Sequence, residues 1–401
     1  MMQMRKTASI LWRTTVGSIQ SRSSIIIEGD RIYVGTCGNH WNHRDKRDGV
    51  HCISLSSGNE LWFTPTLADV NEIALAGSDL IAPTDSGDVF VIDGGNGEIK
   101  FIGRADGPVL AKPIVYRTLG GWTAVIASLT GTIYRLESHS KELSPIGQIG
   151  AQLRANIVPL GFESFVACGE NGLVYKAHMA SSEQLISHPI AELPISEYGG
   201  APSITAGAAV DGSLAYIGYA RDTYYQSPAV ACVDLENECL LWTAPKGNIG
   251  LGNVRATPLL IDGRLVVASA YSDSLQIMSP VDGELLGQVV LGQNVFQQWS
   301  GPTAVGPHHV AVGRVDGVCS IVDIRNMRLM ASVSLVTADK ERSSVSDHAD
   351  EQDFKLYPGE PAPAGAICGT PAFSGKSLVI GTTDGALASI SIQVANSSSL
   401  H

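Results

Sequence analysis

The stretch "DGVHCISLSSGNELWF" (48–63) has the pattern of two short β-strands joined by a turn. An Asp-Gly pair opens it, a run with alternating apolar residues follows, and a Ser-Ser-Gly-Asn turn leads to a run that contains a tryptophan. Glycine supplies the positive φ that tight turns require, and alternation is typical of a strand with one buried face. The stretch therefore predicts one hairpin, which is the repeating unit of this chain.

Seven further stretches repeat this unit, at intervals of roughly 40–70 residues. They begin at residues 86, 130, 171, 228, 272, 316 and 384. Before each unit lies a pair of β-rich runs with Gly, Pro or Asp between them, as in "SSIIIEGDRIYVGT" (23–36), which predicts an earlier hairpin. Each copy is therefore predicted to contain four antiparallel strands, which we name a, b, c and d in chain order.

The last copy ends at about Ile392, after its strand c, and lacks a strand d. The N-terminal run "ILWRTT" (10–15) resembles "ELWFTP" (60–65) and "LLWTAP" (240–245), which both end their own copies. We expect this run to complete the last sheet and to close the ring. The sequence thus predicts an all-β fold, a single eight-bladed β-propeller of four-stranded blades over residues 1–393. Residues 394–401 are predicted to form a disordered tail.

These motifs resemble the propeller family with pyrroloquinoline-quinone-type repeats, whose blades end in a pattern close to "DGxlyalDxxTGkxlW". Residues 48–62 match that pattern, the other copies match it more loosely, and the resemblance covers nearly the whole chain. The family includes quinone-dependent alcohol dehydrogenases and non-enzymatic scaffolds. The resemblance implies the propeller fold, but fold alone does not choose between these functions.

The composition narrows the class of function. The 401 residues carry a formal net charge of −12, which makes nucleic acid an unlikely partner. We find neither a secretory signal nor a run of membrane-spanning length, and the seven cysteines show no CxxC spacing. We therefore expect a cytoplasmic protein that does not bind membranes.

The sequence lacks the motifs of several enzyme classes. The resemblance implies that a quinone dehydrogenase would carry a calcium or rare-earth site and usually a disulfide between adjacent cysteines, but no two cysteines are adjacent here. "GKS" (375–377) lacks the glycine of a phosphate-binding loop, and neither GxSxG nor HExxH occurs. We therefore expect no catalytic residues, no cofactor and no metal.

The longest departures from the repeat predict where a partner would bind. Loops b–c and d–a emerge on one face of a propeller, here called the top face, and turns a–b and c–d emerge on the bottom face. Segments 37–49, 188–200, 220–228 and 336–363 all belong to the top face by this assignment, and insertions gathered on one face usually mark a binding surface. The predicted partner-binding residues are Trp41, His40, His43, Arg44, Tyr198, Arg221, Tyr224, Tyr225, Phe296 and Trp299. The alternative is that the aromatic rings pack against their own loops.

The blade 1 loop admits a second interpretation. Cys37, His40 and His43 are zinc-ligand types, and they would form a site if they converged with a fourth ligand or water. His51 and Cys52 belong to strand c and point to opposite faces, so they do not complete it. We favour a solvated loop that contacts a partner.

Three arginines, Arg22, Arg154 and Arg255, align at the first residue of their inner strands, where they would face the upper mouth of the axial channel. They could hold an anionic ligand or an acidic side chain of a partner, or each could pair with a group on the next blade. The preferred function is a non-catalytic scaffold that docks another protein, such as an ATPase or protease component of the same system. The alternative is a sensor of a small anion at the channel mouth.

Overall fold

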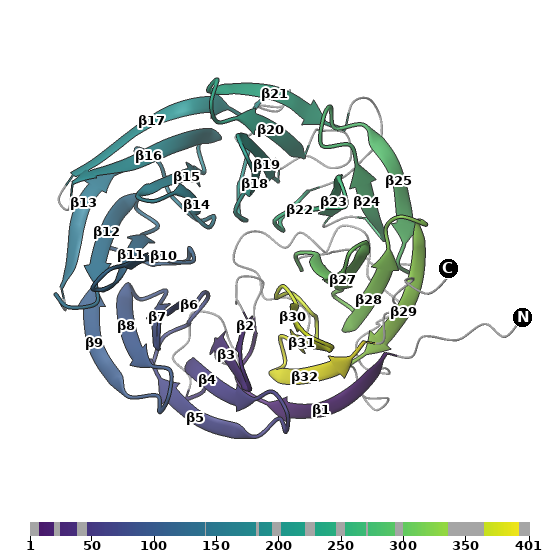
Figure 1. The fold of residues 1–401 in the computed structure, drawn as a ribbon, viewed down its shortest axis with the longest axis horizontal. Coiled ribbons are helices and arrows are strands. Elements are labelled where there is room, and N and C mark those ends of the chain that lie inside the picture. The colour runs from purple at the N-terminus through teal and green to yellow at the C-terminus, as the bar shows by residue number, and fades with distance from the viewer. Residues whose placement is uncertain are drawn as a thin grey trace, which may run out of the picture.

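The computed structural model describes residues 8–19, 25–37, 46–140, 142–181, 184–194, 202–220, 229–245, 253–269, 272–292, 300–335 and 365–392. Its regular elements are all strands, and they form eight four-stranded antiparallel sheets arranged around a central axis (Figure 1). This confirms the predicted eight-bladed propeller. None of the described residues forms a helix long and apolar enough to span a membrane. The predicted tail lies outside the described residues.

Blades 1 to 4 each use four consecutive strands, and hydrogen bonds join neighbours in chain order. Blade 1 contains β2 (Ile25–Glu28), β3 (Arg31–Thr36), β4 (Gly49–Ser54) and β5 (Glu60–Pro65). Blade 2 contains β6 (Ala74–Ala76), β7 (Asp79–Pro83), β8 (Asp88–Asp93) and β9 (Ile99–Arg104). Blade 3 contains β10 (Ile114–Thr118), β11 (Gly121–Ala127), β12 (Thr132–Glu137) and β13 (Leu143–Gln148). Blade 4 contains β14 (Val158–Gly161), β15 (Ser164–Cys168), β16 (Leu173–Ser181) and β17 (Gln184–Glu192).

Blades 5 to 7 follow the same rule, and blade 8 borrows its last strand from the N-terminus. Blade 5 contains β18 (Ala209–Asp211), β19 (Leu214–Gly218), β20 (Val230–Asp234) and β21 (Cys239–Ala244). Blade 6 contains β22 (Leu259–Ile261), β23 (Arg264–Ala268), β24 (Ser274–Met278) and β25 (Leu285–Val290). Blade 7 contains β26 (Thr303–Gly306), β27 (His309–Gly313), β28 (Val318–Asp323) and β29 (Arg328–Ser334). Blade 8 contains β30 (Ala372–Ser374), β31 (Ser377–Gly381), β32 (Ala386–Ser391) and β1 (Ser9–Thr15).

Strand β1 closes the ring as predicted. It pairs antiparallel with β32, from Ser9 opposite Ser391 to Thr15 opposite Ala386, and Figure 1 shows the two strands side by side at the junction of chain start and chain end. The Arg13 guanidinium also donates a hydrogen bond of 2.8 Å to the backbone carbonyl of Leu335 in blade 7. The N-terminal strand therefore joins blade 8 and also touches its neighbour.

The apolar core lies between the blades. Every residue of β4 is buried, whereas the outer strand β5 is mostly exposed or half-buried. One buried cluster contains Tyr33 and Val50 of blade 1 together with Leu80 and Phe90 of blade 2. Blades pack face to face around the ring, so both faces of the middle strands are shielded from water. Burial along these strands is therefore continuous and does not alternate from residue to residue.

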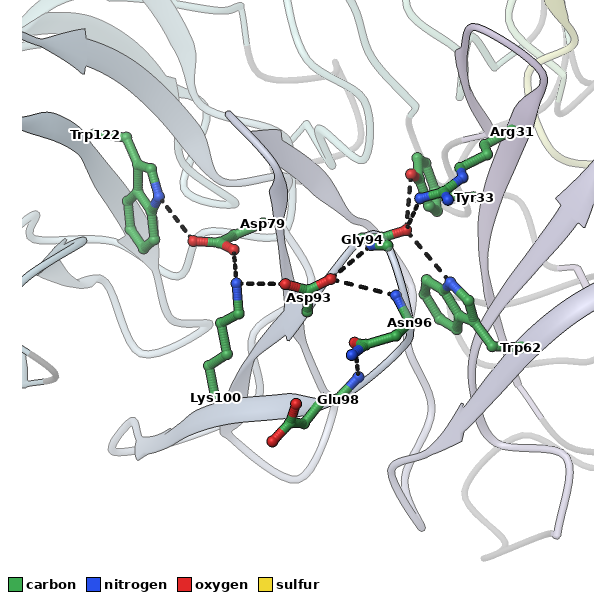
Figure 2. Close-up of polar contacts among 11 residues, drawn as sticks. Arg31, Tyr33, Trp62, Asp79, Asp93, Gly94, Asn96, Glu98, Lys100 and Trp122 are labelled. Carbon is green, nitrogen blue, oxygen red and sulfur yellow. Dashed lines mark hydrogen bonds and ion pairs between the residues drawn. The ribbon is translucent and has the colours of Figure 1, made fainter.

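Polar latches on the bottom face add to this packing. In blade 2, the backbone carbonyl of Gly94 directly follows strand c and accepts hydrogen bonds from three side chains of blade 1 (Figure 2). The donors are the Arg31 guanidinium at 2.7 Å, the Tyr33 hydroxyl at 3.0 Å and the Trp62 indole at 3.3 Å. A buried carbonyl needs hydrogen-bond partners, and these three bonds supply them. We call such a contact between a side chain of one blade and the c–d turn of the next a latch. It also fixes the distance between the two blades.

The same carbonyl position is latched in three other blades. The bonds run from Trp12 to Leu55 at 2.7 Å, from Lys176 to Leu235 at 2.9 Å and from Arg264 to Ile324 at 2.6 Å. In each case a side chain of the preceding blade donates to the c–d turn of the next. These repeated latches make the bottom face a fixed frame.

Candidate functional site: the top face and the channel mouth

The lengths of the connections differ sharply between the two faces. Every a–b turn has two residues, and no c–d turn is longer than the six residues of 279–284. On the top face, b–c connections reach twelve residues (37–48), and the d–a connection before blade 8 spans 335–371. The long connections thus all lie on the top face, whereas the bottom-face turns have two to six residues. One predicted boundary was wrong, since residues 188–192 belong to β17 because they pair with β16, and the connection begins at residue 193.

Most of the predicted site residues lie outside the described residues. This holds for all ten predicted partner-binding residues, from Trp41 to Trp299, and for Arg22. The strands on either side of these residues are described, and they are strand pairs of the b–c or d–a kind. Of the site residues predicted from sequence, the structure describes Arg154 and Arg255.

The prediction that these two arginines begin inner strands was wrong. Strand β14 begins at Val158, four residues after Arg154, and β22 likewise begins four residues after Arg255. The reason is that the backbone here bonds to the preceding blade instead of its own sheet, as the Leu153 amide does to the Leu129 carbonyl at 3.1 Å. Both arginines therefore lie in the segment that leads into a blade, which we call the lead-in segment.

Arg154 is engaged by an acidic partner. Its Nε lies 2.5 Å from Oε1 of Glu170, and both side chains are 22% exposed. Glu170 lies in the b–c turn of the same blade, and its amide bonds to the Gln152 carbonyl at 3.0 Å. The expected alternative, a paired arginine, therefore describes Arg154, although its partner belongs to its own blade instead of the next one.

Arg255 is half-buried in a tightly packed segment. Its backbone carbonyl accepts a hydrogen bond of 3.3 Å from the Thr205 hydroxyl. The preceding residue, Val254, packs closely on Gly218 of blade 5. A Cβ added to Gly218 would lie 2.4 Å from a methyl carbon of Val254. The lead-in segment of blade 6 is therefore held against blade 5, and this fixes the backbone of Arg255.

Sequence analysis missed a polar link between lead-in segments. The Asn156 amide nitrogen donates to Glu72 Oε1 at 3.3 Å, so it joins the segments of blades 2 and 4. The Asn156 amide oxygen in turn accepts the backbone N–H of Lys112, at the entry to blade 3, at 2.7 Å. Polar residues within otherwise apolar lead-in segments were the available signal. Because these groups use their hydrogen-bonding capacity on one another, we interpret them as a structural network and not as a binding site.

Cys37 lies in an acidic, buried environment. It is fully buried, and burial together with the nearby Asp69, Asp85 and Asp48 raises the pKa of its thiol well above the usual value. A zinc ligand must be a thiolate, so a metal ion would have to displace this firmly held proton. His40 and His43 lie outside the described residues. The surroundings of Cys37 thus lend no support to the zinc interpretation.

Comparison with known proteins finds similarity of structure alone. No family model and no curated protein sequence matches this chain. It is similar to the crystal structure of BamB from Moraxella catarrhalis, with a TM-score of 0.68, 12% identity and coverage of 97% of this chain and 99% of that one. It is also similar to the computationally designed Ika8 protein, with a TM-score of 0.64, 14% identity and coverage of 94% and 98%. At these identities the similarity shows the propeller fold and supports the repeat-family resemblance only at that level.

Proposed function

We propose that this chain is a non-catalytic cytoplasmic scaffold that docks a partner protein on its top face. The observation that carries the proposal is the asymmetry of the connections, which are short throughout the bottom face and long at several places on the top face. Latches between blades hold the ring below, so the fold can present variable loops without losing stability. The family that the repeats resemble includes non-enzymatic scaffolds, and this agrees with the proposed function.

The b–c loops of blades 1 and 5 supply the proposed anchors. They contain Trp41 and Tyr224, and their blades lie on opposite sides of the ring (Figure 1). Tryptophan, tyrosine and arginine are enriched in binding hot spots, where they fill well-packed pockets that exclude water. A partner that touches both loops spans the channel mouth. An ATPase or a protease of the same system is the kind of partner that we propose.

The anion sensor is the weaker candidate. The guanidinium of Arg154 already faces Glu170 at 2.5 Å, so its charge is balanced within the chain. An anion at this position would have to compete with a carboxylate that is held by the same blade. This favours a docking surface over a small-anion pocket.

The test compares matched apolar changes on the two faces. A partner recovered from the native host with the wild-type chain is titrated against Trp41→Ala and Tyr224→Ala. The control variants are Leu119→Ala and Phe162→Ala, which change exposed apolar residues in a–b turns of the bottom face. We expect the top-face variants to weaken binding by about 1–4 kcal/mol and the controls to leave it unchanged.

The opposite pattern is loss of binding with the bottom-face variants alone. It would show that the long connections are insertions that the fold tolerates and that do not bind the partner. Stoichiometric binding of a small anion that is lost in Arg154→Gln would instead favour the sensor.

A further inference from the structure

Two histidines and one aspartate meet on the bottom face of blade 7. His309 begins β27 and lies directly opposite Asp323, the last residue of β28, in the register of the sheet. His308 precedes it in the two-residue a–b turn. One potential ligand atom from each of the three residues lies within 4.8 Å of the other two. The pairing of β27 and β28 (Figure 1) thus gathers three residue types that bind metals.

The His308 ring has unused capacity for coordination. The two rings lie with centroids 4.5 Å apart and their planes 36° apart. The Nδ1 atom of His308 is buried and has no hydrogen-bond partner in the described part of the chain. Buried polar atoms are normally satisfied, so an exception requires a physical explanation. An imidazole nitrogen that offers its lone pair to a cation provides one.

Asp323 is only partly used by its own turn. Its Oδ1 accepts the backbone N–H groups of Arg325 and Asn326, and its Oδ2 accepts the Asn326 side-chain amide at 2.8 Å. Arg328 Nε lies 3.6 Å from Oδ2, beyond hydrogen-bond range. A carboxylate has about four lone-pair directions, so three hydrogen bonds leave about one of them for a cation.

The equivalent turns of two other blades show what is special here. Asp93 and Asp234 accept backbone N–H groups from their c–d turns in the same way as Asp323. The residue opposite Asp93 is Asp79, and a lysine, Lys100, bridges these two carboxylates at 2.6 and 2.7 Å (Figure 2). In blade 7 the residue opposite Asp323 is His309, with His308 beside it, and Arg328 lies farther off, with its Nε 3.6 Å from Asp323 Oδ2. Imidazole combined with carboxylate is a ligand set for a metal ion.

The frame around the cluster is rigid. Arg325 forms a forked ion pair with Asp262 of blade 6, with contacts of 3.0–3.2 Å. The amide of Ile324 donates to the His308 carbonyl at 3.0 Å, which ties the c–d turn to the a–b turn. Supporting contacts of this kind hold the ligands of metal sites in place.

We propose that His308, His309 and Asp323 bind one divalent transition-metal ion of borderline softness, such as Zn²⁺. Ligand atoms at 2.0–2.2 Å from a tetrahedral ion lie about 3.4 Å from one another, so small rotations of the imidazole rings would close the present spacing. Water would take the remaining position. The ion would staple the a–b turn to the c–d turn of blade 7. This site lies on the bottom face, so it is independent of partner docking on the top face.

The experiment uses the full chain, purified without a polyhistidine tag and stripped of metal. Zn²⁺ binding is measured by calorimetry, and Co²⁺ is used as a spectroscopic probe of the ligand set. We expect one ion per chain, and at least tenfold weaker binding in His308→Ala and in Asp323→Asn, whose amide oxygen still accepts the turn's N–H groups. His308→Gln is the second variant if alanine impairs folding. Zn²⁺ should raise the melting temperature of the wild type but not of these variants.

Two controls localise the ion. His188→Ala removes an exposed histidine that pairs with Glu238 on blade 5, and it should leave binding unchanged. The double variant His40→Ala/His43→Ala tests the blade 1 loop. Loss of binding in that double variant with retention in His308→Ala, or no stoichiometric binding by the folded wild type, would overturn the proposal.

Discussion

At the scale of single residues, the tryptophans of the repeat act between blades. Trp62 of blade 1 covers Gly97 in the c–d turn of blade 2, where an added Cβ would lie 2.8 Å from the indole. Trp242 covers Gly283 of the next blade in the same way. The sequence predicted the turn glycine and the strand tryptophan separately. It could not show that they touch, because the contact joins two repeats and has no fixed spacing along the chain.

This contact predicts a difference between two glycine variants. Gly97 and Gly375 both have a positive φ, of 78° and 63°. Gly97→Ala should lower the free energy of unfolding by about 2–4 kcal/mol, because it adds overpacking against Trp62 to the backbone cost. Gly375→Ala meets no atom within 4 Å and should lose only the backbone part, about 1–2 kcal/mol. Denaturant unfolding measures both variants, and equal losses would show that the indole contact contributes nothing.

At the scale of elements, the closing strand was predictable to within a residue or two. "ILWRTT" repeats the pattern of other outer strands, and pattern alone assigned it to blade 8. The irregularity in its register between Ile10 and Trp12 was not predictable, because it depends on the local twist of the pair. Nor was the start of the inner strands, because the lead-in segments bond to the preceding blade.

Removal of the closing strand should destabilise the ring. A chain that starts at Val16 loses its pairing with β32 and the bond from Trp12 to Leu55. We expect the melting temperature to fall by at least about 5 °C, and we expect association through the exposed edge of β32. A chain that starts at Ala8 keeps β1 and is the control. If the shorter chain stayed monomeric with an unchanged melting temperature, β1 would not be the closing element.

At the scale of the whole molecule, the architecture could be read from sequence and the site could not. Eight degenerate copies of the repeat, together with one outer strand at the other end of the chain, predict a closed ring. Each copy and the displaced strand can be recognised from the local pattern of residues alone. The link from Glu72 to Asn156 joins residues 84 positions apart, and the cluster of His308, His309 and Asp323 joins two different turns. Such groupings depend on the register between strands and on the packing of blades, which a pattern of residue types does not contain.

The closed ring also predicts that the chain can be cut and rejoined. Joining Ile392 to Ala8 through a four-residue turn, and opening the chain between Ser140 and Lys141, would make β13 the closing strand. We expect this permutant to be monomeric and to melt within about 5 °C of the wild type, because every strand keeps its partners. Opening the same permutant inside β12, between Tyr134 and Arg135, should prevent folding. Failure of the first permutant to fold would mean that closure at blade 8 is special.

The pairing of β1 with β32 also determines when the ring can close during synthesis of the chain. The ribosome makes β1 before every other strand of the ring and β32 after them. At about 5–20 residues per second the interval between the two is about 20–80 s. During that time Ile10, Leu11 and Trp12 have no sheet to join. Blades 1 to 7 can assemble in order as they emerge, but the nascent chain has to keep β1 unattached until β32 has been made.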